Sequence, residues 1–213
     1  MIPTPIDLTM PLTAGMRGVS YEEARSIEKD GWNARTLHIY SHAGTHMDAQ
    51  THFGAGEETI DLLPLDRCIG PAWVVRLPGL SPGTLLTVAH LGGIAEKFRN
   101  GDSLLFHTGW SAFLEETEIY RDGLPRISEE LARWCVEREV KILGVEPPSV
   151  ADVNNLPELT LIHEILLSAK VTIVEGLTNL EKIPGERCDF GAFPLRISGG
   201  DGCPCRAVAW PES

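Results

Sequence analysis

Residues 41–53 read SHAGTHMDAQTHF and bring together four metal-ligating side chains in a chain with seven histidines in all. The four are His42, His46, Asp48 and His52. Imidazole nitrogen and carboxylate oxygen suit borderline divalent metals such as zinc, and a carboxylate between histidines can bridge two ions. A lone histidine is more often solvated or hydrogen-bonded in a core than a ligand, but a cluster this dense predicts a metal site.

The spacing of this cluster predicts an extended backbone that bends. The offsets from His42 are all even, so a strand would project the four side chains to one side, whereas a helix would scatter them. Fully extended, the run would span roughly 33 Å, far more than a compact site allows. We therefore expect a strand over residues 36–40 to deliver His42 to its end. A tight loop that turns at Gly44 would then carry the other three side chains.

The composition indicates a single domain over residues 1–213. The chain is 43% hydrophobic, which is enough for a sizeable core, and it has no repeat and no evident linker. Its formal charge of -12 argues against nucleic acid or an anionic membrane as a partner, because both need a basic surface. The opening residues lack the basic start and apolar run of a signal peptide, and no later stretch approaches about 20 apolar residues. A soluble cytoplasmic protein is the default expectation.

Five cysteines, an odd number, do not form the pattern of a secreted disulfide framework. Cys203 and Cys205 are the one close pair, and their thiols could in principle join a metal site. The sequence favours ordinary reduced thiols at Cys68, Cys135 and Cys188, because free cysteine behaves mostly as a small buried hydrophobe.

Strands and helices alternate along the chain, which indicates the α/β class. Short apolar or β-branched runs predict buried strands at residues 74–77, 103–107, 141–145 and 171–175. Patterning and capping predict helices at residues 128–138 and 159–169, with weaker signals at 87–99 and 21–29. The glycine-rich N-terminal half suggests extra antiparallel strands, and hence a mixed sheet.

Two further residues carry possible chemistry. Glu175 ends the apolar run VTIV, where a carboxylate is costly unless it is paired or binds a cation. His163 lies alone on a largely apolar predicted helix. The residues themselves leave two interpretations open: a ligand in each case, or a strand-end carboxylate that reaches water and a satisfied core histidine.

Residues 42–52 resemble the signature His-x-Gly-Thr-His-x-Asp-x-Pro-x-His of the cyclase family of metal-dependent hydrolases, whose best-known members are bacterial kynurenine formamidases. The likeness continues in order along nearly the whole chain, at IDLT and PLT (6–13), TGW (108–110), PSV (148–150), EGLTNL (175–180), and GDG with RAV (200–208). It implies a compact α/β domain with a mixed β-sheet or barrel-like core and flanking helices.

The resemblance also implies a site with two divalent metal ions, zinc or manganese. Its five ligands would be His42, His46, Asp48, His163 and Glu175. The first three would bind one ion. Asp48 would also touch the second ion, which His163 would ligate, and Glu175 would complete the site by bridging.

His52 is implied as the catalytic acid and base. An imidazole titrates near neutrality, so it can take a proton from the attacking water and return it to the leaving nitrogen. The implied reaction is metal-assisted amide hydrolysis, with N-formylkynurenine giving kynurenine and formate. One alternative is a related hydrolase that opens a cyclic amide such as isatin. Another is a non-catalytic metal-binding protein, against which the additional His52 argues.

Several departures leave the substrate-binding residues unassigned. Gln50 replaces the signature proline, and we expect a looser loop there. Formamidases carry a tryptophan-containing stretch where residues 16–24 have none; Tyr21 or Trp32 could offer an aromatic face, but neither matches the position. His107 precedes TGW, either beside the site or as a hydrogen-bonded strand-end residue. The resemblance further implies a homodimer or tetramer whose neighbouring chains help to enclose the pocket around a small-molecule substrate.

Overall fold

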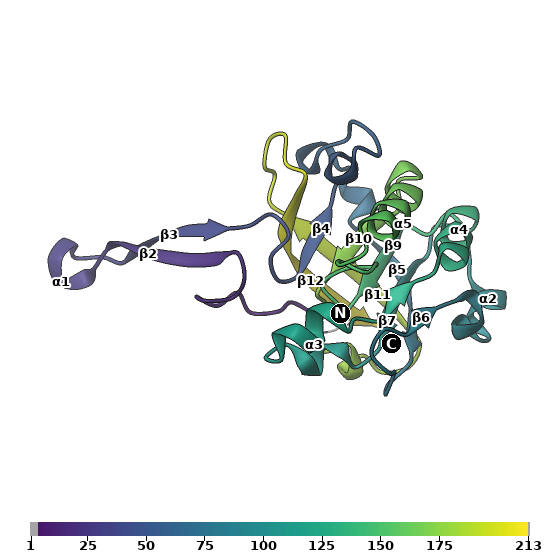
Figure 1. Ribbon diagram of the computed structural model, residues 1–213. Helices are drawn as coiled ribbons and strands as arrows, with labels where there is room; N and C mark the ends of the chain where they lie inside the picture. Colours follow the sequence, from purple (N-terminus) through teal and green to yellow (C-terminus); the bar gives the residue numbers. More distant parts are fainter. Residues whose placement is uncertain (1–3, 213) are drawn as a thin grey trace.

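The structure, a computed structural model, describes residues 4–212 and is built on a closed mixed barrel (Figure 1). Its main sheet has eight strands in the order β1-β12-β11-β5-β7-β9-β10-β4, and β12 also pairs with β4. That pairing closes a ring of all the strands of this sheet except β1 (Ile6–Asp7), which pairs with β12 outside the ring. The ring strands are β4 (His46–Asp48), β5 (Ile69–Arg76), β7 (Ser103–His107), β9 (Ile142–Val145), β10 (Thr172–Glu175), β11 (Arg187–Pro194) and β12 (Gly202–Pro211).

Both faces of the central strands are buried. Strands β5, β7, β9 and β10 run parallel, whereas β11, β12 and β4 pair antiparallel. Alternate side chains of a strand point to opposite faces. On β5, Ala72 and Val74 fill the barrel interior while Trp73 and Val75 pack outward. This double burial explains why these strands read as nearly continuous apolar runs.

Helices cover the outer face of the parallel strands. The longer ones are α4 (Glu129–Glu137) and α5 (Leu156–Ser168), whose buried residues join one apolar cluster with β5, β7 and β9. Shorter elements connect the rest: α2 (Ile94–Lys97), α3 (Thr117–Asp122), the paired strands β6 (Leu85–Leu86) and β8 (Arg126–Ile127), and 3-10 helices at Gln50–Phe53, Ile60–Leu62, Leu65–Arg67, Val88–Leu91, Trp110–Phe113 and Leu180–Lys182. No helix in the described part of the chain is long and apolar enough to cross a membrane.

Most of the predicted elements are confirmed. Strands β7, β9 and β10 lie within a residue of their predicted ranges, and β5 begins five residues earlier than predicted. Ser128 caps α4 by accepting the Leu131 amide, as predicted. The predicted helix at 87–99 is wrong as one element: Gly92, with a φ of 52°, separates a 3-10 turn from α2.

The helix predicted over residues 21–29 is wrong. Residues 19–25 form strand β2 (Val19–Arg25), which pairs with β3 (Ala34–Ile39), and only α1 (Ile27–Asp30) at the tip is helical. The hairpin projects far from the barrel as an arm, here defined as residues 19–39 (Figure 1). Cross-strand pairing outweighs the high helix propensity of its glutamates and alanine.

Candidate metal centre

Strand β4 brings two of the cluster residues, His46 and Asp48, to one face of the sheet. It lies between β10 and β12, so that His46 is opposite Glu175 on one side and Asp48 is opposite Gly202 on the other. Met47, between the two, points into the barrel interior. The expectation that a loop carries His46 and Asp48 is therefore wrong, because pairing on both sides draws this segment into the sheet.

The predicted turn at Gly44 is confirmed. Gly44 has a φ of 63°, in the left-handed region that favours glycine. The Thr45 hydroxyl donates to the Gly176 carbonyl over 2.6 Å, and a Cβ on Gly176 would lie 2.5 Å from the Gly44 carbonyl oxygen. The turn before β4 thus packs directly on the turn after β10, which fixes the cluster against Glu175.

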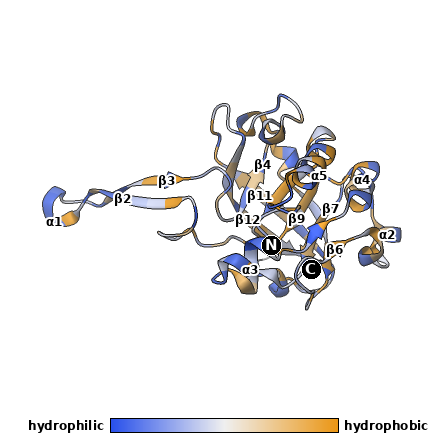
Figure 2. Ribbon diagram, viewed as in Figure 1, coloured by the Kyte–Doolittle hydropathy of each residue, from blue (hydrophilic) through white to orange (hydrophobic). Residues whose placement is uncertain are grey.

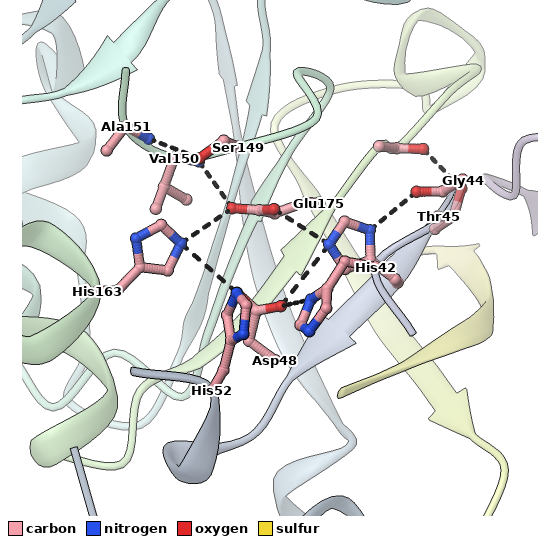
Figure 3. Close-up of polar contacts among 12 residues, drawn as sticks. His42, Gly44, Thr45, Asp48, His52, Ser149, Val150, Ala151, His163 and Glu175 are labelled. Atoms are coloured by element: carbon pink, nitrogen blue, oxygen red, sulfur yellow. Dashed lines mark hydrogen bonds and ion pairs between the residues drawn. The ribbon is translucent and has the colours of Figure 1, made fainter. Parts of the chain in front are cut away.

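Two buried carboxylates lie between two buried histidines (Figure 3). His46 Nε2 is 3.2 Å from Glu175 Oε2 and 3.7 Å from Asp48 Oδ1. His163 Nε2, from α5, is 3.6 Å from both Glu175 Oε1 and Asp48 Oδ2. Each carboxylate therefore turns one oxygen to each histidine, which is the arrangement that bridging two cations requires.

The outer nitrogens of these two histidines are fixed by the backbone. His46 Nδ1 donates to the Gly44 carbonyl over 2.9 Å, and His163 Nδ1 donates to the Leu159 carbonyl over 2.7 Å. A proton held on Nδ1 leaves the neutral ring with its lone pair on Nε2. Both Nε2 atoms face the carboxylates, where the lone pair of the neutral ring is directed for metal ligation.

His42 and His52 stack on each other at the edge of this cluster. Their ring centroids are 3.7 Å apart and the rings are inclined by 23°. His42 Nδ1 lies 2.9 Å from Asp48 Oδ1, and its Nε2 lies 3.0 Å from Asp201 Oδ2. His52 is 23% exposed and makes no hydrogen bond to the carboxylates, so its side chain lies nearest to solvent among the cluster's imidazoles.

The loop that carries His52 is tethered to α5. Gln50 Nε2 donates to the Leu167 carbonyl over 2.8 Å, and the Gln50 carbonyl accepts the Ala55 amide. Gln50, which replaces the proline of the family signature, therefore restrains the loop, contrary to the expected loosening. Phe53 follows, stacked on His163 at 4.2 Å and edge-on to His52.

The electrostatics separate His52 from the other histidines. Burial lowers the pKa of His42, but hydrogen bonds and charge from Asp48 and Asp201 outweigh it and raise that pKa from 6.5 to about 9. At His46 and His163, burial lowers the pKa, but the neighbouring carboxylates raise it by more, so the pKa of each is raised. The pKa of His52 is lowered, chiefly by burial. Among the four histidines of the site, His52 is thus the one whose neutral form is favoured.

The residues fit a pair of divalent cations. Asp48 Oδ2 is buried and has no hydrogen-bond partner, which leaves a charged acceptor that a cation would satisfy. Two sets of ligand atoms converge within 4.8 Å: His42, Asp48 and His52, and His46, Asp48 and Glu175. His163 Nε2 approaches the two carboxylates of the second set, on the side away from His46. The pKa values of Asp48 and Glu175 are lowered, mainly by the histidines against the effect of burial, so both carboxylates are charged.

Other residues singled out in the sequence lie elsewhere. Tyr21 donates its hydroxyl to the Leu12 carbonyl at the root of the arm, and Trp32 is exposed on the arm. His107 is at the end of β7, 3.3 Å from Arg76. Cys203 and Cys205 are buried in the barrel interior and, within residues 4–212, belong to neither ligand set.

Asp201 is a site residue that sequence reasoning missed. It lies in the segment GDG, which resembles the family's C-terminal strand, but the segment alone gave no reason to place its carboxylate beside His42. The register of β12 against β4, which sets Gly202 opposite Asp48, makes the connection.

Comparison with known proteins places this chain in a family. The Cyclase family model, described as "Putative cyclase", matches residues 6–152. A kynurenine formamidase of Salinibacter ruber is 31% identical over 186 residues, covering 86% of this chain and 82% of the relative. Isatin hydrolase A from Labrenzia aggregata shares the fold with a TM-score of 0.84 at 22% identity, covering 99% of this chain and 94% of the other. "The structure of predicted metal-dependent hydrolase from Bacillus stearothermophilus" matches with a TM-score of 0.76 at 25% identity, over 98% of each chain. This chain belongs to the cyclase family of metal-dependent hydrolases.

Proposed function

We propose that this protein is a metal-dependent amidase that cleaves an arylformamide, with N-formylkynurenine as the substrate and kynurenine and formate as products. The observation that carries the proposal is the pair of buried carboxylates, Asp48 and Glu175, set between two histidines whose Nε2 atoms face them. The similarity to several proteins named kynurenine formamidase supports the choice of substrate.

The five ligands are assigned by which carboxylate oxygen each histidine faces. His42, His46 and Asp48 Oδ1 would hold one ion, and His163 with Asp48 Oδ2 the other, with Glu175 bridging. Bound divalent ions, zinc or manganese, would lower the pKa of water from 15.7 towards about 7 and polarise the amide carbonyl.

His52 has the position and the protonation state of a general acid and base. It stacks on His42, it is the more exposed of the two, and its pKa is lowered, so the neutral ring can accept a proton from water. The imidazolium so formed would then donate that proton to the leaving aromatic nitrogen. The nearby Asp48 and Glu175 carboxylates would stabilise the imidazolium while it exists.

The test is hydrolysis of N-formylkynurenine by the zinc-loaded protein, with His52→Ala as the key variant. We expect His52→Ala to keep its metal and to lose about 10²- to 10⁴-fold in turnover. The exposed arm histidine gives a matched control, since His38→Ala should leave both unchanged. A His52→Ala variant with near wild-type turnover would contradict the role of His52, and metal-loaded wild type that is inert on the formamide would refute the substrate.

A second candidate substrate is a cyclic amide such as isatin. It is favoured by the missing formamidase tryptophan: residues 16–24 contain none, Tyr21 donates its hydroxyl to the Leu12 carbonyl, and Trp32 is exposed on the arm. Ring opening of isatin in the same assay, without formamide cleavage, would select this candidate. A protein that binds metal stoichiometrically and cleaves neither would instead be a metal-binding protein without catalysis.

We propose that the arm packs on a second copy of the chain. No residue of α1 is buried, and Ile27, Trp32 and Leu37 are more than half exposed, so the arm has both polar and apolar surface without a partner (Figure 2). An isolated two-stranded hairpin is marginally stable in water, so contact with another chain would stabilise it. The arm ends three residues before His42, next to the metal centre. Light scattering after chromatography should give a dimer or larger assembly that Trp32→Ser with Leu37→Ser disrupts, and a monomeric wild type would exclude it.

A further inference from the structure

In each histidine that faces the carboxylates, the ring nitrogen on the far side from them, here called the outer nitrogen, is held by a fixed hydrogen-bond acceptor. For His46 and His163 the acceptors are the backbone carbonyls of Gly44 and Leu159. Metal-ligating histidines characteristically donate the outer N–H to a carbonyl or carboxylate, which fixes the tautomer and the ring orientation. A carbonyl cannot be removed by substitution, but a carboxylate can.

His42 has the same arrangement with a side chain as the acceptor. Its Nδ1 lies 2.9 Å from Asp48 Oδ1 and its Nε2 lies 3.0 Å from Asp201 Oδ2. We propose that Asp201 is a positioning residue of the metal centre, which accepts the Nε2–H of His42 and thereby turns Nδ1 towards Asp48 and the ion. The role rests on the proposed function only in so far as that function requires a metal to bind here.

The fold holds Asp201 in place for this contact. Its carbonyl accepts the Ala49 amide over 2.9 Å, immediately after β4, and the next residue, Gly202, pairs with Asp48. A Cβ on Gly202 would lie 2.5 Å from His42 Cε1, so the imidazole packs against the glycine backbone with no room for a side chain. The ring of His42 is thus confined between Gly202, His52 and the two carboxylates.

Asp201 forms its hydrogen bond with His42 and not with His52. The distance from Asp201 Oδ2 to His52 Nδ1 is 3.7 Å, which is too long for a hydrogen bond, whereas the contact with His42 has hydrogen-bond length. His46 and His163 face the carboxylates through Nε2, but His42 does so through Nδ1. Asp201 therefore selects the opposite nitrogen at this one ligand.

The first test measures zinc affinity by competition with a chromophoric chelator at a single pH. We expect Asp201→Ala to lose about 10- to 100-fold in affinity. Asp189→Ala, which removes an exposed aspartate from the neighbouring strand β11, should retain wild-type affinity. Because Asp201 acts through His42, turnover of Asp201→Ala should recover at saturating zinc. Unchanged affinity, or turnover that stays low at full zinc occupancy, would overturn the role.

The second test needs no variant that perturbs folding. Long-range proton–nitrogen NMR of the zinc-loaded, ¹⁵N-histidine-labelled wild type should show zinc on Nδ1 and the proton on Nε2 at His42, with the reverse at His46 and His163. Zinc on Nε2 of His42 would overturn the inference. A protein that binds zinc in the expected pattern but hydrolyses neither candidate substrate would refute the amidase and leave Asp201's role standing; one that binds no zinc would refute both.

Discussion

Without metal, His42 should make the stability of this protein fall as the pH rises. Its side chain is only 8% exposed and lies between Asp48 and Asp201, which raise its pKa from 6.5 to about 9 against the effect of burial. The folded pKa is above the unfolded value, so the stabilisation is fully present below pH 6.5 and is lost as the pH passes about 9. At 1.36 kcal/mol per pKa unit, the shift is worth about 3 kcal/mol at most.

The assay compares urea unfolding of the metal-free protein, kept in a chelator, below pH 6.5 and above about pH 9. The free energy of unfolding should exceed that of His42→Gln at low pH by an amount that shrinks by about 3 kcal/mol at high pH. Comparing the two proteins at each pH cancels the titration of lysines and thiols elsewhere. The exposed arm variant His38→Gln should follow the wild type.

Two results would refute this reasoning. A gap between wild type and His42→Gln that is the same at both pH values would mean that no net charge is stabilised at His42. A gap that widens with pH would mean that the neutral ring is preferred there. The raised pKa values of His46 and His163 act in the same direction in both proteins. The His42 charge lowers the pKa of His46, so its loss in His42→Gln changes the size of that contribution but not its sign.

Two substitutions test parts of the site, and a third tests Glu146, a buried carboxylate outside it. Asp48→Asn removes the carboxylate charge shared by both ligand sets, so metal content after dialysis should fall at both positions; stoichiometric retention would contradict the shared role. Gly202→Ala would place a Cβ 2.5 Å from His42 Cε1, so chelator competition should show weakened binding in a folded protein, and unchanged binding would mean the ring can move aside. Glu146→Ala would leave the buried amides of Thr108 and Trp110 without the carboxylate that accepts them, lowering the urea-derived stability by about 3 kcal/mol or more, whereas exposed Glu139→Ala should not.

The sequence predicted the parts of the fold that depend on local pattern. Strand β7 was predicted at its full length because its apolar run is buried on both faces. The start of α4 was predicted because Ser128 is a cap whose hydrogen bond lies within four residues. The ligand set could be listed from the resemblance, and the structure brings its members together through the pairing of β4 with β10.

Features that depend on distant pairing could not be predicted. The closure of the barrel rests on β4 pairing with β12, more than 150 residues later, and no local pattern encodes that register. The arm was mistaken for a helix because residues 21–29 contain good helix formers, whereas its strand character comes from cross-strand partners.

Gln50 and Asp201 show how such pairing sets the chemistry. Each is unremarkable by residue type, yet one fastens the loop that carries His52 to α5 and the other holds the outer nitrogen of His42. The two imidazoles stack at 3.7 Å, so a shift of either anchor would move both rings. His42 and His52 therefore form one unit in which a ligand and a proton carrier are positioned by two distant elements. It follows that a change at either anchor should weaken metal binding and, at limiting zinc, lower turnover with it, whereas a change at His52 alone should lower turnover and spare metal binding.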